Sequence, residues 1–195
     1  MARLFLAIRI PEQVQNEIEK RFYPLLGRFG KKLKPVLPQN LHITLCFLGE
    51  QPLERTEPIR QKLDWISQVP KFEIKLKGAG TFQNRVLWIG IPRASAQLKT
   101  LARKAAQALK TKPEKKAHLT IARNKSVSKP QFRELRQEIR KKEWTASFAV
   151  STIELLESKQ KTASPQYSIK TAWVLRKQAN PRAKAVLPGQ NNTAG

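Results

Sequence analysis

The stretch Leu41-His-Ile-Thr-Leu-Cys-Phe-Leu48 sets the expected fold, because the core of this stretch recurs as Ala117-His-Leu-Thr-Ile-Ala-Arg123. Both stretches are rich in apolar and β-branched residues, which is typical of strands. Each follows a basic linker that contains proline, and a segment with helical spacing of apolar residues precedes each linker. The two stretches therefore predict two equivalent strands in a duplicated fold.

The rest of the chain repeats in one order around these two strands. The first half predicts, in turn, a strand over 3–10, a helix over 12–29, the His42 strand, a helix over 52–67 and a strand over 71–77. The second half predicts a strand over 85–91, a helix over 95–110, the His118 strand, a helix over 130–141 and strands over 148–156 and 166–175. Alternation of helices and strands is common in mixed proteins, but the matching positions of the two motifs favour duplication.

Composition narrows the partners and the chemistry. The chain of 195 residues has 38 Lys and Arg against 14 Asp and Glu, which favours a polyanionic partner such as RNA, DNA or an anionic membrane surface. No apolar run is long enough to span a membrane. The stretch that begins at Met1 lacks the basic region, the long apolar run and the small-residue cleavage site of a signal peptide. With Cys46 as the single cysteine, we expect a cytoplasmic protein. Asp64 is the single aspartate, so a carboxylate-bound metal pair is not expected.

The spacing inside each motif points to phosphodiester chemistry. Residues two apart on a strand face the same side, so His42 shares a face with Thr44, and His118 shares one with Thr120. If both strands face one cleft, two imidazoles and two hydroxyls surround a small anion. One histidine can take a proton from water while the other gives a proton to the departing oxygen. The hydroxyls can donate to the non-bridging oxygens as negative charge builds on them.

Three other interpretations of these residues are weaker. A single histidine beside a threonine on a strand is usually a structural residue, whereas two copies in equivalent repeats favour a functional pair. Two histidines supply two zinc ligands, and no second cysteine is present to complete such a site, so no metal site is expected. Cys46 lies roughly 13 Å along an extended strand from His42, so it is expected to be a buried apolar residue and not a nucleophile.

The motifs resemble those of the two-histidine phosphoesterases, and within them the RNA 2′,3′-cyclic phosphodiesterases, also called 2′-5′ RNA ligase-like proteins. The likeness runs from Leu4 to about Leu175. The stretches that carry it include Asn40-Leu-His-Ile-Thr-Leu-Cys-Phe-Leu-Gly-Glu50, Arg85-Val-Leu-Trp-Ile-Gly90, Ala117-His-Leu-Thr-Ile-Ala-Arg123 and Leu155-Leu-Glu-Ser158.

This resemblance implies a bilobal α+β fold with two antiparallel sheets around a central cleft and helices on the outside. It implies metal-independent hydrolysis of a 2′,3′-cyclic phosphate RNA end, such as that of a tRNA fragment, to a 2′-phosphomonoester, with no cofactor. His42 is then the proton donor and His118 the proton acceptor. It also implies that Arg123 contacts the phosphate and that Phe47 stacks on the nucleobase. Strand parity argues against Phe47, since it should face away from His42, unless a bulge near Gly49 rotates it.

The domain boundaries follow from the pattern. We expect one bilobal domain over 1–176, a monomer in solution, and a flexible polar tail over 177–195. Six lysines lie in the linkers before the motif strands and form either a basic rim for the RNA backbone or ordinary solvated charges: Lys31, Lys32, Lys34, Lys112, Lys115 and Lys116.

Three rival functions remain open. The first is a non-catalytic basic RNA-binding protein on the same scaffold. The second is joining of RNA ends through the same site, in the reverse direction. The third is another cyclic phosphate, such as a small cyclic nucleotide or an ADP-ribose derivative, which a narrow pocket without a basic rim would favour.

Overall fold

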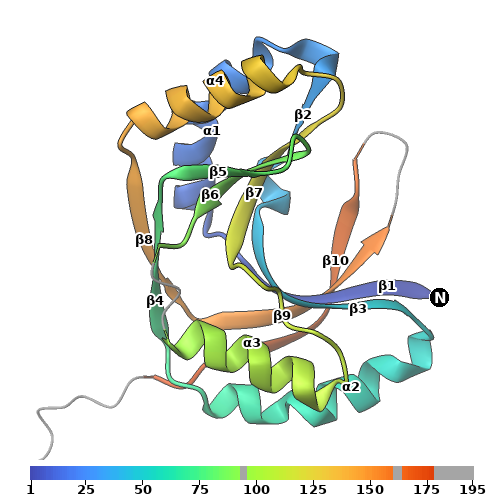
Figure 1. Cartoon of the computed structure of the whole chain (residues 1–195). Coiled ribbons are helices and arrows are strands. Elements are labelled where there is room, and N and C mark those ends of the chain that lie inside the picture. The colour runs from blue at the N-terminus through green and yellow to red at the C-terminus, as the bar shows by residue number, and fades with distance from the viewer. Residues whose placement is uncertain (93–95, 160–163, 178–195) are drawn as a thin grey trace, which may run out of the picture.

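A computed structural model of the chain describes residues 1–92, 96–159 and 164–177 (Figure 1). Apart from Lys177, the tail expected over 177–195 lies outside the described residues. The helices are α1 (Glu12–Gly27), α2 (Thr56–Leu63), α3 (Ala96–Ala108) and α4 (Lys129–Lys141). The strands are β1 (Ala2–Arg9), β2 (Leu33–Pro35), β3 (His42–Gln51), β4 (Phe72–Lys77), β5 (Ala79–Phe82), β6 (Val86–Gly90), β7 (His118–Asn124), β8 (Thr145–Val150), β9 (Thr152–Lys159) and β10 (Gln166–Val174).

Two antiparallel sheets organise these strands. The larger has eight strands in the order β10-β9-β1-β3-β7-β6-β5, and β2 is added at β7. The smaller is a ribbon of β4 and β8, which pair from Phe72 and Val150 to Lys77 and Thr145. The mixed fold class and the two antiparallel sheets are thus confirmed, whereas the bilobal division stays a prediction.

The duplication is visible in how equivalent strands pair. β3 and β7, which carry the two motifs, are antiparallel neighbours, and Ile43 is paired with Leu119. Both residues directly follow the histidine of their motif, so each strand meets its counterpart at the same position. β4 and β8, the last strands of the two repeats, also pair with each other. This is the arrangement expected when a twofold axis relates the two repeats.

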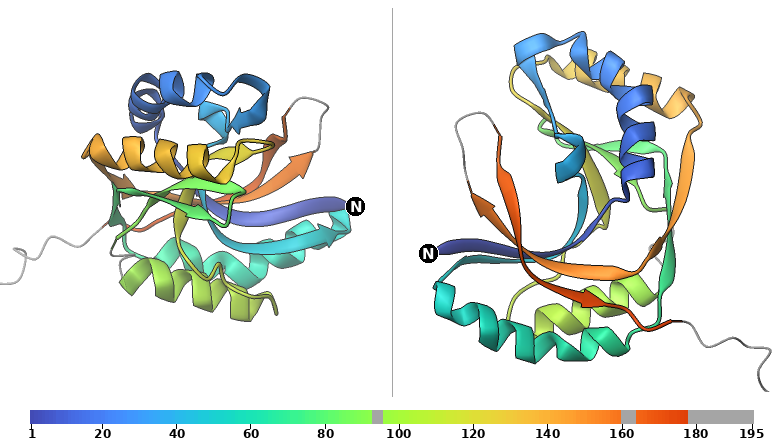
Figure 2. Two further views of the ribbon diagram at one scale, coloured as in Figure 1. Left: turned by 45° about the horizontal axis from the view of Figure 1, so that its top comes forward. Right: turned by 180° about the vertical axis from the view of Figure 1, so that it is seen from behind.

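The helices cover the sheet in two pairs. α2 and α3 lie together beside the β3, β1 and β9 end of the large sheet, whereas α1 and α4 lie beside β2 and β5 (Figures 1 and 2). The predicted apolar stripe of α1 is buried as Val14, Ile18, Phe22 and Leu26. No helix among the described residues is long and apolar enough to cross a membrane.

The structure departs from the predicted elements in three places. The strand predicted over 148–156 is two strands, β8 and β9, because the chain turns at Ser151, whose carbonyl accepts from the Leu175 amide. β2 and β5 were not predicted, since one is three residues long and ends in Pro35, and the other contains Gly80. The helix predicted over 52–67 is α2 flanked by short 3₁₀ turns.

Gly80 of β5 leaves room for a large side chain beside the second motif. It is paired with Trp88 of β6, and a Cβ atom at Gly80 would lie 2.2 Å from the Trp88 ring. The absence of a side chain at Gly80 therefore leaves the space that the indole of Trp88 occupies. In this position Trp88 is buried, and its ring centroid is 6.4 Å from that of His118.

We expect Gly80→Ala to lower the free energy of unfolding by about 1–3 kcal/mol, because the new methyl group displaces a packed indole ring. Gly27→Ala is the matched control, since a Cβ atom there meets nothing within 4 Å. Urea denaturation followed by fluorescence would measure both variants. Equal stability of the Gly80 and Gly27 variants would contradict this account of Trp88.

Candidate active site

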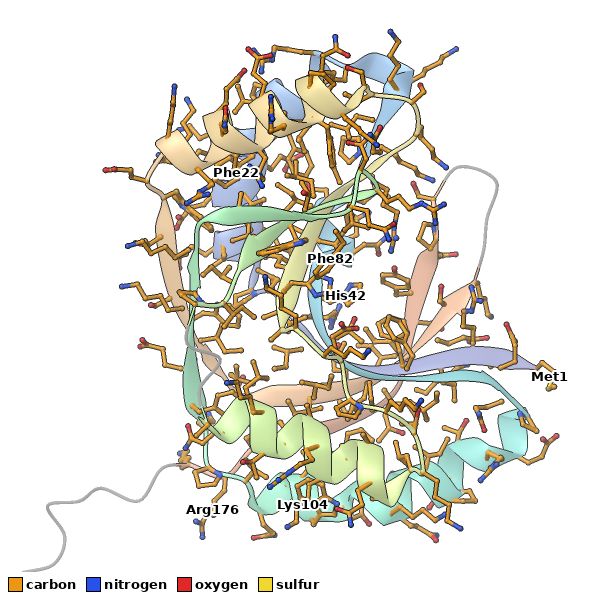
Figure 3. The ribbon with its side chains drawn as sticks, in the orientation of Figure 1. Met1, Phe22, His42, Phe82, Lys104 and Arg176 are labelled. Carbon is orange, nitrogen blue, oxygen red and sulfur yellow. The ribbon has the colours of Figure 1, made fainter. Side chains whose placement is uncertain are left out.

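The two histidines are held by the same hydrogen bond at equivalent positions. Nδ1 of His42 donates to the carbonyl of Asn40, and Nδ1 of His118 donates to the carbonyl of Lys116, both at 2.7 Å. A carbonyl only accepts, so Nδ1 carries the proton in each neutral ring. Nε2 is therefore the nitrogen left to exchange a proton with a substrate. Figure 3 places His42 near the centre of the molecule, where β3 and β7 meet.

The register of β3 and β7 brings both motifs to one face. Because Ile43 is opposite Leu119, continuing the register sets His42 opposite Thr120, and Thr44 opposite His118. Ile43 and Leu119 are fully buried on the other face. In a regular antiparallel pair, residues diagonally opposed in this way lie about 7–8 Å apart. The sequence prediction of two imidazoles and two hydroxyls on one face therefore agrees with the strand register.

A bulge in each motif strand adds one further residue to this face. In β3, Ala7 is paired with Thr44 and Leu6 with Cys46, so Leu45 is an extra residue in the strand. In β7 the shift between Leu87 and Trp88 leaves Ile121 as the extra residue. An inserted residue reverses the side-chain alternation beyond it. The fifth residue after each histidine, Phe47 in one strand and Arg123 in the other, therefore faces the same side as the histidine.

This bulge resolves the parity objection to Phe47. The rotation comes from Leu45, closer to the motif than the expected position near Gly49, where a second register shift also occurs. The ring of Phe47 lies 6.0 Å from that of Phe5, which in turn lies 5.1 Å from the ring of His42. Phe47 is 55% exposed, so its ring is accessible for contact with another planar group.

Aromatic rings flank both histidines, and sequence reasoning had not assigned them to the site. His42 forms a cluster of three rings with Phe5 of β1 and Tyr167 of β10, whose ring centroids lie 5.1 and 5.2 Å from that of His42 and 5.1 Å from each other. His118 lies 4.8 Å from Phe82, in an edge-on contact. Phe5 lies in the apolar strand β1, where the sequence predicts only core packing. Tyr167 reaches the site because β10 pairs with β9, and β9 pairs in turn with β1, a long-range pairing that has no local signal in the sequence.

The pKa of His42 departs strongly from the ordinary value for histidine. Its pKa is lowered from 6.5 to about 4, first by burial and then by the positive charges of Arg123 and His118, against the opposing effect of the hydrogen bond to Asn40. The imidazole is therefore neutral at pH 7 in the ligand-free protein. Arg123 and His118 therefore lie close enough to His42 to act on its charge.

A cysteine nucleophile and a metal site are the alternatives to the histidine pair. Cys46 is buried, and burial raises the pKa of its thiol to about 12, so it is protonated at neutral pH. Among the described residues, no three His, Cys, Asp or Glu side chains gather in a group that could hold a metal ion. Thr44 is buried and Thr120 is partly buried, as befits hydroxyls at the bottom of a site.

Curated relatives align with most of the chain. One, from Methanocaldococcus jannaschii, is named RNA 2′,3′-cyclic phosphodiesterase and is 35% identical over 178 residues, which cover 88% of this chain and 99% of the relative. Another of the same name, from Archaeoglobus fulgidus, is 36% identical over 132 residues, covering 63% of this chain and 73% of the relative.

Solved structures share the fold. Escherichia coli LigT complexed with NADP⁺ superposes with a TM-score of 0.69 at 25% identity, over 89% of this chain and 98% of LigT. The protein TT0787 of Thermus thermophilus superposes with a TM-score of 0.71 at 25% identity, over 91% of this chain and all of TT0787.

A family profile decides the classification. The profile described as the 2′-5′ RNA ligase superfamily matches residues 10–162, a range that contains both histidine motifs and both bulges. With the relatives and structures above, this match shows that the chain belongs to the 2′-5′ RNA ligase superfamily.

Proposed function

We propose that this protein hydrolyses the 2′,3′-cyclic phosphate at an RNA end to a 2′-phosphomonoester, using His42 and His118 as its acid and base. The observation that carries the proposal is the pairing of Ile43 with Leu119, which sets both histidines on one face. The relatives named RNA 2′,3′-cyclic phosphodiesterase support the choice of substrate. The net charge of +24 fits a polyanionic substrate.

The reaction balances with two imidazoles and one water. Nε2 of the neutral histidine takes a proton from water as the water oxygen forms a bond to phosphorus. The bond from phosphorus to the 3′ oxygen breaks, and the protonated histidine gives its proton to that oxygen. The products are a free 3′-hydroxyl and a 2′-phosphate. The two Nδ1 hydrogen bonds keep both rings in the tautomer that these steps require.

The resemblance assigns His42 as donor and His118 as acceptor, and the lowered pKa of His42 sets a condition on that assignment. A donor must be protonated, whereas His42 is neutral at pH 7 in the empty site. A bound phosphodiester anion would raise the pKa of His42, because opposite charge favours the protonated ring. In this scheme, the bound substrate anion favours protonation of His42, and the protonated ring is the proton donor.

Three polar side chains are suited to stabilise the developing charge on the phosphate oxygens. The hydroxyls of Thr44 and Thr120 sit opposite the two histidines in the strand register. The guanidinium of Arg123, turned to this face by the bulge at Ile121, can donate two parallel hydrogen bonds to phosphate. These groups let the site work without a metal, since they supply the positive charge and donors that a cation would otherwise provide.

The lone cysteine bears on where the reaction takes place. Cys46 is a buried free thiol, which is stable in a reducing compartment. We therefore place the reaction in the cytoplasm, where RNA ends with a cyclic phosphate are its partners and fragments of tRNA are candidates.

We expect His42→Ala and His118→Ala each to lower kcat on a nucleoside 2′,3′-cyclic phosphate by about 10²–10⁴-fold, because each removes one proton-transfer step. Wild type should retain its rate in EDTA and release the 2′-phosphate. Thermal unfolding of both variants serves as the control for folding. Near-wild-type turnover by either variant would favour a non-catalytic RNA-binding protein, and loss of activity on chelation would exclude the metal-free mechanism.

We expect Arg123→Gln to raise the pKa of His42 in the ligand-free protein. Removing a positive charge stabilises the protonated ring, so the pKa moves from about 4 back toward 6.5. An NMR titration of the His42 ring would measure the change. Lys34→Gln is the matched control, because Lys34 is paired with Arg123 across β2 and β7 but does not contribute to the His42 shift. An unchanged His42 pKa in Arg123→Gln would place Arg123 outside the site.

We expect Phe47→Ala to raise KM for a nucleoside 2′,3′-cyclic phosphate by about fivefold or more, with little change in kcat, because stacking on a base adds affinity without touching phosphorus. Val174→Ala removes another exposed apolar side chain, on β10, and should leave both constants unchanged. Steady-state kinetics on cyclic phosphates with different bases would test this. A fall in kcat alone would show that Phe47 does not stack on the base.

A further inference from the structure

A groove with a volume of about 910 Å³ adjoins the candidate active site. Thr44 of the first motif lines it, and so do Trp88 and Ala117, the neighbours of His118. From there it runs along α3 toward the corner between β4 and β5 and the end of α4. Pockets of 300–1,000 Å³ hold ligands larger than a phosphate group, so this groove extends the site well beyond the reacting atoms.

The rim of the groove is strongly basic. Seven exposed cations line it: Lys77, Lys99, Arg103, Lys112, Lys115, Lys116 and Arg140. Glu114 is the one acidic side chain among its lining residues. In the part of the chain that the structure describes, none of the seven cations forms an ion pair with a carboxylate. The positive charge of the groove is therefore left for an anionic partner.

The groove wall is preformed where it meets the active site. The amide of Glu114 donates to the carbonyl of Leu45 at 2.8 Å, which holds the linker before β7 against β3. The ammonium of Lys116 lies 4.2 Å from the centre of the Trp88 ring. Lys116 also accepts the His118 hydrogen bond through its carbonyl, so one residue belongs to both the groove and the catalytic pair.

The floor of the groove is apolar. Trp88, Ile91 and Ala102 lie along it. An apolar floor beneath a basic rim matches single-stranded nucleic acid, whose phosphates face cations while its sugars and bases contact apolar surface. A flat membrane surface would not follow this concave path.

We propose that this groove binds the RNA strand that precedes the cyclic phosphate, so that the protein acts on RNA ends several nucleotides long in preference to mononucleotides. The inference rests on the proposed function. A 2′,3′-cyclic phosphate terminates a strand, so the rest of the RNA leaves the site in one direction only. The lining cations, none of which forms an ion pair with a described carboxylate, mark that direction.

The test uses the double variant Lys99→Gln/Arg103→Gln, which removes two charges from α3 without touching the histidines. Lys104→Gln is the control on the same helix, α3, where Figure 3 labels Lys104. Its ammonium lies 4.6 Å from the centre of the Trp65 ring, and Lys104 is not among the residues that line the groove. Binding of a labelled oligoribonucleotide of about ten residues with a terminal 2′-phosphate would be followed by fluorescence anisotropy across a salt series. Hydrolysis of a nucleoside 2′,3′-cyclic phosphate is measured in parallel.

We expect the double variant to bind the oligoribonucleotide about tenfold more weakly at about 50 mM salt, with a salt slope shallower by about 1.4, because two phosphate contacts are lost. Hydrolysis of the nucleoside substrate should be unchanged. Oligoribonucleotide binding equal to wild type would overturn the groove proposal. So would a loss of binding free energy in Lys104→Gln of half the double variant's loss or more, because one charge is removed there and two are removed in the double variant. If wild type hydrolyses no cyclic phosphate while the double variant still loses RNA affinity, the proposed function fails and the groove assignment stands.

Discussion

The pairing of Ile43 with Leu119 is the contact on which the rest of the site depends. It joins the two halves of the chain into one sheet, and it does so at the residue next to each histidine. A slip of one residue in this register would turn one imidazole to the apolar face. Both paired side chains are fully buried, so the hydrophobic effect holds the register without using any polar group of the site. The polar face is thereby left free for chemistry.

The bulge in each motif strand explains how three side chains of that strand come to face the candidate site. A strand without irregularity presents His42 and Thr44 and then turns the next chemically useful side chain away. The extra residue at Leu45 corrects this for Phe47, and the one at Ile121 does so for Arg123. The two halves thus keep the imidazole and hydroxyl in common and differ at the fifth position. One half offers an aromatic ring and the other a cation. Under the proposed function, this difference would give the symmetric frame one side for the base and one side for the phosphate.

The sequence predicted the four helices and all the strands except β2 and β5, with β8 and β9 merged into one, because local patterns of apolar residues mark these elements. It also predicted the histidine pair, because the motif appears twice. The two threonines followed from strand alternation alone. Phe47 was opposed by that same alternation, since a bulge has no dependable local signature. Phe5, Tyr167 and Phe82 could not be found, because apolar residues of a strand read as core until the neighbouring strands are known. The basic groove was equally hidden: its cations come from α3, α4, the β4–β5 corner and one linker, and only tertiary packing brings them together.

The twofold relation between β3 and β7 has a consequence for the direction of the reaction. When a nucleophile displaces a leaving group in line, the pentavalent phosphorus holds the entering and departing oxygens at opposite apices, and the two are nearly interchangeable. A half-turn about the twofold axis would exchange the two imidazoles. The site therefore has the same symmetry as the pair of entering and departing oxygens. For the joining of RNA ends, a 5′-hydroxyl would enter at the apex that water uses in hydrolysis, opposite the departing 3′ oxygen. Bond cleavage and bond formation between RNA ends would then differ in which nucleophile is abundant, not in the geometry that receives it.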